Sequence, residues 1–414
     1  MKVAIIGTGI SGLTAAYLLH KDFDLTLYEA NTYVGGHTNT VDVDLPEGRY
    51  AVDTGFIVFN EITYPNFCEI LRQLGVDFQP TRMTFSVKCE KTGLEYSPHN
   101  LNAFFAQRRN LLSPSFWRVI AEIFRLRSQF GRILSHDTAS TPLVSYLREQ
   151  GFSSRFIELF IVPLGASLWS TDPESFEEFP LETFVRFFKN HGFLQVRNPF
   201  EWRVIRGGSR RYVEKMTQGF ADCIRTDTPV TGIQRFDDRV EVTDRSGAIV
   251  SYDQVILAVH SDQALAMLVD PTTAERDILG AIPYRENDTV LHTDPRILPK
   301  RRWIWSSWNY LITREKQNRA SLTYDMNILQ SLNASQEFCV TLNQTEAVDP
   351  GLIKGRFTYS HPQFTRRSPE VQQRHGEISG TNRTHYCGAY WGYGFHEDGV
   401  NSGLQVASWF GKEL

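Results

Sequence analysis

The first 29 residues constrain the fold more than any other part of this 414-residue chain. Val3 to Ile6 is an unbroken apolar run, as expected of a buried strand in a parallel sheet. Gly7, Gly9 and Gly12 follow it in the order G-x-G-x-x-G. In a strand–turn–helix unit the first glycine permits a tight turn, the second lets a pyrophosphate approach the backbone, and the third lets the helix pack on the strand. The stretch therefore predicts a dinucleotide site.

The residues that follow complete a β-α-β unit. Residues 13–19 present the apolar face of a helix, and residues 24–29 form a second strand that ends at Glu29. The start of the helix, with Ile10 and Ser11 in its first turn, offers free N–H groups and a partial positive charge to phosphates. Glu29 stands about 20 residues beyond the glycines, where an acidic side chain accepts hydrogen bonds from a ribose. Together these features indicate a Rossmann-like domain.

Two further segments distinguish between dinucleotides. "EANTYVGGHTNTV" places a glycine pair shortly after Glu29, and "YAVDTGFIVFN" follows it. A plain NAD dehydrogenase has no need of these segments, whereas a chain that runs along FAD and reaches its isoalloxazine ring does. Cofactor contacts are therefore expected at Gly36, His37, Thr38, Thr54, Gly55 and Phe56.

These pieces, with "VTGI" at Val230 and "CGAYWGYGFHEDGVNSG" at residues 387–403, resemble the FAD-dependent amine oxidase, protoporphyrinogen oxidase and phytoene desaturase superfamily. The resemblance implies an FAD-dependent oxidoreductase with non-covalent FAD and an adenine contact at Val230. One position departs from the superfamily pattern. An Arg or Lys usually follows the glycine pair, but this chain has His37, whose charge depends on pH.

The resemblance also implies that the C-terminal segment returns to the flavin. A turn at Asp398-Gly399 would open a last helix from Val400, whose N-terminus stabilises negative charge on the reduced flavin. Aromatic side chains beside it would exclude water, and a histidine there would be a candidate base, although core packing and a structural histidine stay open as alternatives. Cofactor contacts are expected at Gly388, Asp398, Gly399 and Val400, and catalytic contacts at Trp391, Tyr393 and His396.

We expect an α/β fold with two discontinuous domains. Residues 1–80, 201–265 and 381–414 would form a Rossmann-like, glutathione-reductase-type FAD domain, in which residues 228–259 contain a β-meander and a buried strand. Residues 81–200 and 266–380 would form a mixed α+β substrate domain.

Composition excludes several classes of function. A net charge of −4 and a pI of about 6.3 give no indication of nucleic-acid binding. The five cysteines form no C-x-x-C pair and the eleven histidines show no ligand spacing, so neither a disulfide framework nor a metal site is expected. With no signal peptide or spanning segment visible, we expect a cytoplasmic protein.

An arginine-rich segment at residues 104–132 allows two interpretations. It holds six arginines against one acid, Glu122, with Phe, Trp, Leu and Ile at helical spacings. Such a helix can lie on an anionic membrane, here the inner face, and "PKRRWIWSSWNYLI" adds the Arg–Trp mixture found at bilayer interfaces. The alternative is a core helix with a solvated basic face.

The C-terminal third narrows the resemblance to bacterial predicted NAD/FAD-binding amine-oxidase-like proteins, associated with genes for cyclopropane and methyl-branched fatty acids. This implies oxidation of a hydrophobic substrate, a fatty acyl chain of a membrane lipid, and a lipid-modifying methyltransferase as partner. Two alternatives stay open. An amine oxidase would use Trp391, Tyr393, Glu397 and Asp398 around a cation, and a non-catalytic flavin-binding protein would support a neighbouring enzyme.

Overall fold

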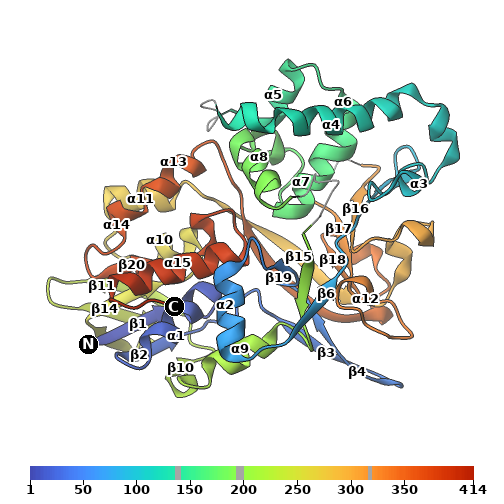
Figure 1. The fold of residues 1–414 in the computed structure, drawn as a ribbon. Coiled ribbons are helices and arrows are strands. Elements are labelled where there is room, and N and C mark those ends of the chain that lie inside the picture. The colour runs from blue at the N-terminus through green and yellow to red at the C-terminus, as the bar shows by residue number, and fades with distance from the viewer. Residues whose placement is uncertain (136–140, 193–199, 316–318) are drawn as a thin grey trace.

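A five-stranded parallel sheet is built around the N-terminal unit (Figure 1). The structure is a computed structural model that describes residues 1–135, 141–192, 200–315 and 319–414. In sheet order the strands are β10 (Ile224–Arg225), β2 (Asp24–Tyr28), β1 (Lys2–Ile6), β14 (Gln254–Leu257) and β20 (Thr384–Tyr386). Helix α1 (Ile10–Leu19) connects β1 to β2, so the predicted β-α-β unit is confirmed.

Both faces of this sheet are covered. Val3 and Ile5 pack with α1 and with α15 (His396–Trp409), whereas Ala4 and Ile6 pack with the predicted meander. Successive strand side chains point to opposite faces, which is why a strand buried on both sides is apolar without alternation. The meander is β11 (Val230–Arg235), β12 (Val240–Asp244) and β13 (Ile249–Tyr252), flanked by α10 (Ser261–Met267), α11 (Thr273–Leu279), α13 (Ser368–Gln373) and α14 (His375–Ile378).

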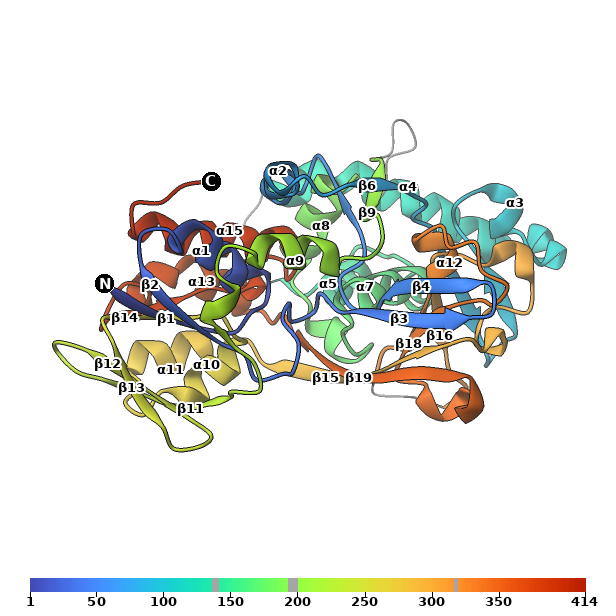
Figure 2. The same cartoon turned by 90° about the horizontal axis from the view of Figure 1, so that it is seen from below.

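A second, seven-stranded sheet has the order β19-β15-β18-β17-β16-β7-β8. Its long antiparallel pair, β15 and β19, runs between the two halves of the molecule (Figure 2). The strands are β7 (Phe85–Cys89), β8 (Leu94–Tyr96), β15 (Tyr284–His292), β16 (Trp308–Ile312), β17 (Leu322–Asp325), β18 (Cys339–Leu342) and β19 (Ile353–Pro362).

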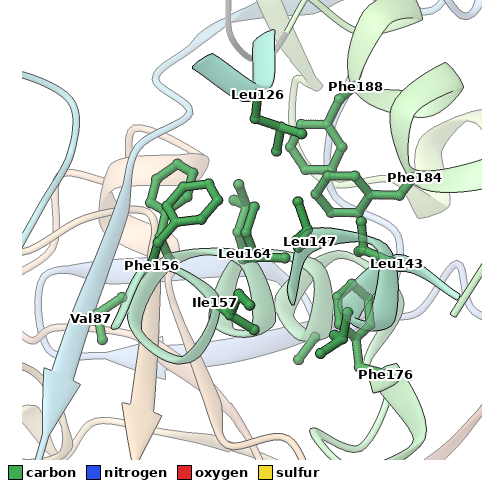
Figure 3. Close-up of a cluster of buried hydrophobic side chains, with 14 of the residues drawn as sticks. Val87, Leu126, Leu143, Leu147, Phe156, Ile157, Leu164, Phe176, Phe184 and Phe188 are labelled. Atoms are coloured by element: carbon green, nitrogen blue, oxygen red, sulfur yellow. The ribbon is translucent and has the colours of Figure 1, made fainter. Parts of the chain in front are cut away.

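A helical layer packs on this second sheet around an aromatic-rich core (Figure 3). Phe156, Phe176, Phe184 and Leu164 meet there, together with Val87 from the sheet. The elements are α3 (Leu101–Phe104), η1 (Arg108–Leu112), α4 (Pro114–Leu134), α5 (Leu143–Glu149), α6 (Ser154–Phe156), η2 (Ile157–Ile161), α7 (Val162–Trp169), η3 (Ser175–Glu178) and α8 (Leu181–Asn190).

The remaining elements are mostly short. They are β3 (Thr40–Leu45), β4 (Gly48–Asp53), β5 (Phe59–Asn60), α2 (Pro65–Leu74), β6 (Phe78–Thr81), β9 (Trp202–Ile205), α9 (Arg210–Thr217), η4 (Ala221–Cys223), η5 (Pro295–Ile297), η6 (Arg302–Ile304), α12 (Met326–Leu329), η7 (Thr345–Ala347), η8 (Pro350–Leu352) and η9 (Ala389–Trp391). The predicted domain boundary after residue 265 falls inside α10, which packs on α11. The division into two domains stays a prediction.

Helix α4 contains four of the six arginines of the arginine-rich segment, while Arg108 and Arg109 lie in η1. The apolar face of α4, including Phe116 and Leu126, is buried in the aromatic-rich core. Arg118 pairs with Glu122, and Arg125 donates to the Gln150 carbonyl oxygen. One apolar face of α4 is therefore buried, and membrane contact by the arginine-rich segment stays a prediction. In the part of the chain that the structure describes, each helix is too short or too polar to cross a lipid bilayer.

Candidate active site

A cavity of about 640 Å³ lies between the parallel sheet and the second sheet. It follows the carboxyl ends of β1, β2 and β14, where open α/β sheets bind their ligands. The sequence-predicted residues that line it are Gly7, Gly9, Ile10, Ser11, Glu29, Gly36, His37, Gly55, Phe56, Val230, Gly388 and His396. Segments from both ends of the chain thus meet at one cavity.

The three fingerprint glycines are required for different reasons. Gly7 has a φ of +101°, and a Cβ on Gly12 would lie 2.2 Å from the Gly7 carbonyl oxygen, so both serve the strand–helix packing. Gly9 has an ordinary φ of −65°, and its Cβ would have no protein atom within 4 Å. A side chain at Gly9 would project into the cavity without disturbing the fold. Because Gly9 has no side chain, a bound group can approach its backbone closely.

Glu29 is held firmly at the end of β2. One carboxylate oxygen accepts hydrogen bonds from the backbone N–H and hydroxyl of Thr8, and the other accepts from the backbone and side-chain nitrogens of Asn31. The carboxylate faces the cavity beside the glycine turn. A ribose hydroxyl would take the place of one of these donors.

The "VDTGF" segment packs directly on the glycine-pair segment. The Phe56 N–H donates to the His37 carbonyl oxygen over 2.8 Å, and a Cβ on Gly55 would lie 2.2 Å from that oxygen. Thr38 and Thr54 have their hydroxyls on Tyr212 (2.6 Å) and Tyr359 (2.7 Å), and the structure places neither among the cavity-lining residues. These two threonines support the segments that form the wall.

Three of the four histidines that line the cavity lie close together. The ring centroid of His37 lies 6.2 Å from that of His260 and 5.4 Å from that of His361. Burial lowers the pKa of His37, and it lowers the pKa of His260 and of His361 to about 3. His37 Nε2 is buried and has no hydrogen-bond partner among the described residues. No Lys or Arg belongs to the described lining, so histidine is its one source of side-chain positive charge.

His396 is tightly packed at the cavity wall. Its ring stacks on Phe56 with centroids 3.6 Å apart and planes 8° apart, and Nε2 lies 2.8 Å from the Tyr212 hydroxyl. Burial places the pKa of His396 well below its ordinary value. The imidazole is thus neutral, and one of its two nitrogens is already engaged.

The structure corrects the predicted turn at Asp398-Gly399. Helix α15 begins at His396, so Asp398, Gly399 and Val400 lie inside it and outside the cavity lining. Asp398 accepts the Phe395 N–H, and Glu397 accepts the N–H groups of Asn66 and Phe67 at the start of α2. The first N–H groups of a helix have no hydrogen-bond partner within that helix. Both carboxylates therefore act as caps that accept such N–H groups, Asp398 at the start of α15 and Glu397 at the start of α2.

The aromatic wall also differs from the prediction. Trp391 packs on His375, and the Tyr393 carbonyl oxygen accepts from Trp169 Nε1, while neither side chain is among the cavity-lining residues that the structure describes. Their neighbours Tyr390 and Phe395 line the cavity instead.

The sequence analysis did not predict the cavity-lining residues that lie outside the glycine-rich segments and the C-terminal segment. His260 could have been found, since it follows the buried strand β14 at the edge where ligands bind. The other residues come from the second sheet, the helical layer, strand β9 and the segment before β7, and no local motif marks them. They include Met83, Leu168, Phe187, Trp202, Tyr284, Trp308, Tyr324 and His361.

Comparison with known proteins identifies the family. Residues 10–300 match the profile of flavin containing amine oxidoreductases. The chain belongs to this family. As a flavin amine oxidoreductase it is an FAD-dependent enzyme. A 1-hydroxycarotenoid 3,4-desaturase of Flavobacterium sp. (strain P99-3) is 33% identical over 96 residues, which span 23% of this chain and 18% of the desaturase.

Solved structures show the same fold over the whole chain. A triple mutant of putrescine oxidase has a TM-score of 0.70 at 16% identity, covering 99% of this chain and 98% of its own. Cyclohexylamine oxidase from Brevibacterium oxydans IH-35A has a TM-score of 0.70 at 15% identity, covering 98% of each chain. A CLA-producing fatty acid isomerase from P. acnes has a TM-score of 0.71 at 16% identity, covering 99% of this chain and 98% of its own.

The site of this flavin amine oxidoreductase fits FAD. The open space at Gly9, the start of α1 and the Glu29 carboxylate supply the kinds of contact that a pyrophosphate and a ribose need. The buried, unpartnered His37 Nε2 would be available for one more polar contact.

Proposed function

We propose that this enzyme oxidises a neutral, apolar substrate, a fatty acyl chain of a membrane lipid. FAD bound along the glycine-rich edge would accept the hydride, since flavins supply this chemistry and the protein supplies orientation. The individual cofactor contacts, at Gly9, Glu29, Gly36 and His37, are part of the proposal. FAD would be bound without a covalent tether.

The main support for this proposal is the composition of the cavity wall on the side of Phe56 away from the glycine turn. Apolar and aromatic side chains dominate this wall, including Met83, Leu168, Phe187 and Trp308. In the described lining Glu29 is the one carboxylate, and it lies at the nucleotide end. A buried charge without a partner is costly, so such a wall favours a neutral chain over a cation.

Few polar groups are available to orient the substrate. Tyr324 and Ser170 both carry a hydroxyl group, and both residues line the cavity. This pair could hold a carbonyl or hydroxyl on an otherwise apolar substrate. The remaining wall would exclude water from the site of oxidation.

Oxidation of an amine is the second candidate. Trp202, Trp308 and Tyr324 offer aromatic faces that could attract a cation. Putrescine oxidase and cyclohexylamine oxidase, which share the fold, are amine oxidases by name. However, Glu397 and Asp398, the acids expected to bind an amine, cap helices outside the cavity lining.

Anaerobic stopped-flow mixing tests the proposal. Fatty acids and phospholipids should bleach the flavin absorbance, whereas primary amines of similar length should not. Bleaching by amines alone would overturn the acyl-chain proposal in favour of amine oxidation. Lipid profiles of cells with and without the gene should then differ in acyl-chain structure. A changed profile without bleaching by either class would favour the non-catalytic flavin-binding protein.

The predicted partner and location complete the proposal. A lipid-modifying methyltransferase would act on the same acyl chains, from the cytoplasmic side of the inner membrane. Co-purification of the two proteins from cells tests this association.

A further inference from the structure

We infer that an exposed apolar surface at one end of the molecule docks on a bilayer containing anionic lipids. This tip patch consists of Leu101, Leu111, Leu112, Trp117 and Trp303. It lies on α3, η1, the first turn of α4 and η6, at the opposite end from the meander strands β12 and β13 (Figures 1 and 2). The inference does not depend on the substrate.

Contacts join the members of the tip patch into one surface. Trp117 Nε1 donates to the Leu111 carbonyl oxygen over 2.9 Å. The Arg108 guanidinium lies 5.9 Å from the ring centroid of Trp303 and donates to Asn102, which follows Leu101. Beneath the surface, the Phe105 ring lies 4.7 Å from the Trp117 ring. The patch is therefore supported by folded structure.

The exposure of the tip patch is unusual for this chain. Of the twelve large apolar side chains exposed among the described residues, five belong to it, and Leu112 is 88% exposed. Single exposed apolar side chains are normal, but a contiguous group marks a surface that contacts an apolar partner.

Charge identifies the partner as an anionic membrane. Arg108, Arg109, Lys300 and Arg302 are exposed on the same elements or directly beside them. Cations attract anionic headgroups, while Trp and Leu insert at the bilayer interface. This combination suits a lipid surface better than a protein surface of either charge.

The tip patch and the cavity share one core. Phe105 and Phe116, under the patch, belong to the same cluster of buried side chains as Phe187, which lines the cavity. Docking at the patch would therefore hold against the lipid the same helical layer that contributes Phe187 to the cavity wall.

Vesicle sedimentation of the FAD-loaded enzyme tests the inference. Wild type should pellet with vesicles of phosphatidylcholine and phosphatidylglycerol at low salt and should be released as salt rises. Leu112→Asp should weaken binding about tenfold or more, because one exposed leucine loses its contact with the bilayer. Arg109→Glu should weaken binding to anionic vesicles and leave binding to pure phosphatidylcholine vesicles unchanged.

Ile249→Asp is the matched control, because Ile249 is 62% exposed on β13 at the other end of the molecule. It should bind like wild type, and all variants should keep their FAD and circular dichroism. Equal binding of wild type to neutral and anionic vesicles would overturn the inference. So would equal losses in the Leu112 and Ile249 variants, or no vesicle binding by wild type.

Discussion

A Cβ atom on Gly399 of α15 would lie only 2.6 Å from Cγ2 of Ile10 on α1. One turn later, a Cβ on Gly403 would lie 2.8 Å from the Thr14 Cβ. Residues four apart share a helix face, so the two glycines let α15 press against α1. Since Ile10 lines the cavity, this helix contact fixes the position of the glycine turn.

Gly399→Val should therefore separate the two helices. Overpacking of a close contact costs about 1–3 kcal/mol of unfolding free energy. FAD retention should fall as the first turn of α1 moves. Denaturant unfolding of the variant measures the loss, and Gly131→Val, with no atom within 4 Å of its Cβ, is the control. Unchanged stability would show that the interface can open at no cost.

Gly9→Val should behave differently from Gly399→Val. No protein atom lies near the Cβ position of Gly9, so the fold should be kept, while a branched side chain in the cavity should block FAD. Acid precipitation and absorbance of the released flavin measure FAD content. A folded Gly9→Val protein with full FAD would contradict the assignment of this turn to the pyrophosphate.

FAD affinity should depend on pH through His37. Burial lowers the pKa of His37 in the cofactor-free protein, and a phosphate beside it would raise that pKa again. FAD binding would then take up a proton, so affinity should fall as pH rises from the lowered pKa of His37 in the free protein to its higher pKa in the complex. Loss of the charged contact should cost about tenfold in affinity.

Two variants isolate this effect. His37→Arg should bind FAD with little pH dependence, and His37→Gln should bind weakly at both ends of the range. Flavin fluorescence titrations give the dissociation constants. If wild type and His37→Gln share one pH profile, another group is responsible.

His396→Ala should affect stability more than chemistry. The imidazole stacks on Phe56 and bonds to Tyr212, and its lowered pKa makes it a weak base. The free energy of unfolding should drop by about 1–3 kcal/mol, whereas flavin reduction should stay within about tenfold of wild type. Tyr212→Phe tests the hydrogen bond alone. A hundredfold slower reduction at unchanged stability would establish His396 as a catalytic base.

Asp398→Asn should change how stability depends on pH. Burial raises the pKa of Asp398 from its ordinary 3.8 to about 7. The folded protein therefore binds a proton that the unfolded chain releases, and wild-type stability falls as pH rises from about 4 to about 7. The stability of Asp398→Asn does not fall in this way, because asparagine does not titrate. The melting temperature of the variant minus that of wild type should therefore increase over that pH interval and then stay constant.

Asp244→Asn is the control for this titration. Hydrogen bonds from Ser246 lower the pKa of Asp244, so its replacement should bring no gain in melting temperature over the same interval. A constant difference between Asp398→Asn and wild type at all pH values would contradict the buried titration.

Residue spacing alone predicts the nucleotide half of the site. Gly7, Gly9, Gly12 and Glu29 all act within a single β-α-β unit. Residue spacing and apolar periodicity are enough to predict a β-α-β unit, because its contacts are between residues close in sequence. The apolar run of β1 likewise indicated a strand buried on both faces.

What the remaining residues do depends on contacts between segments that are distant in the sequence. His37 meets His260 and His361 because the end of β14 in the parallel sheet lies close to the end of β19 in the second sheet. Which strands of two sheets meet cannot be read from residue spacing. Glu397 caps α2 although the two are more than 300 residues apart in sequence. The apolar wall and the tip patch arise in the same way. Distant side chains come together only once strand register and helix packing are set, and these depend on contacts across the whole chain.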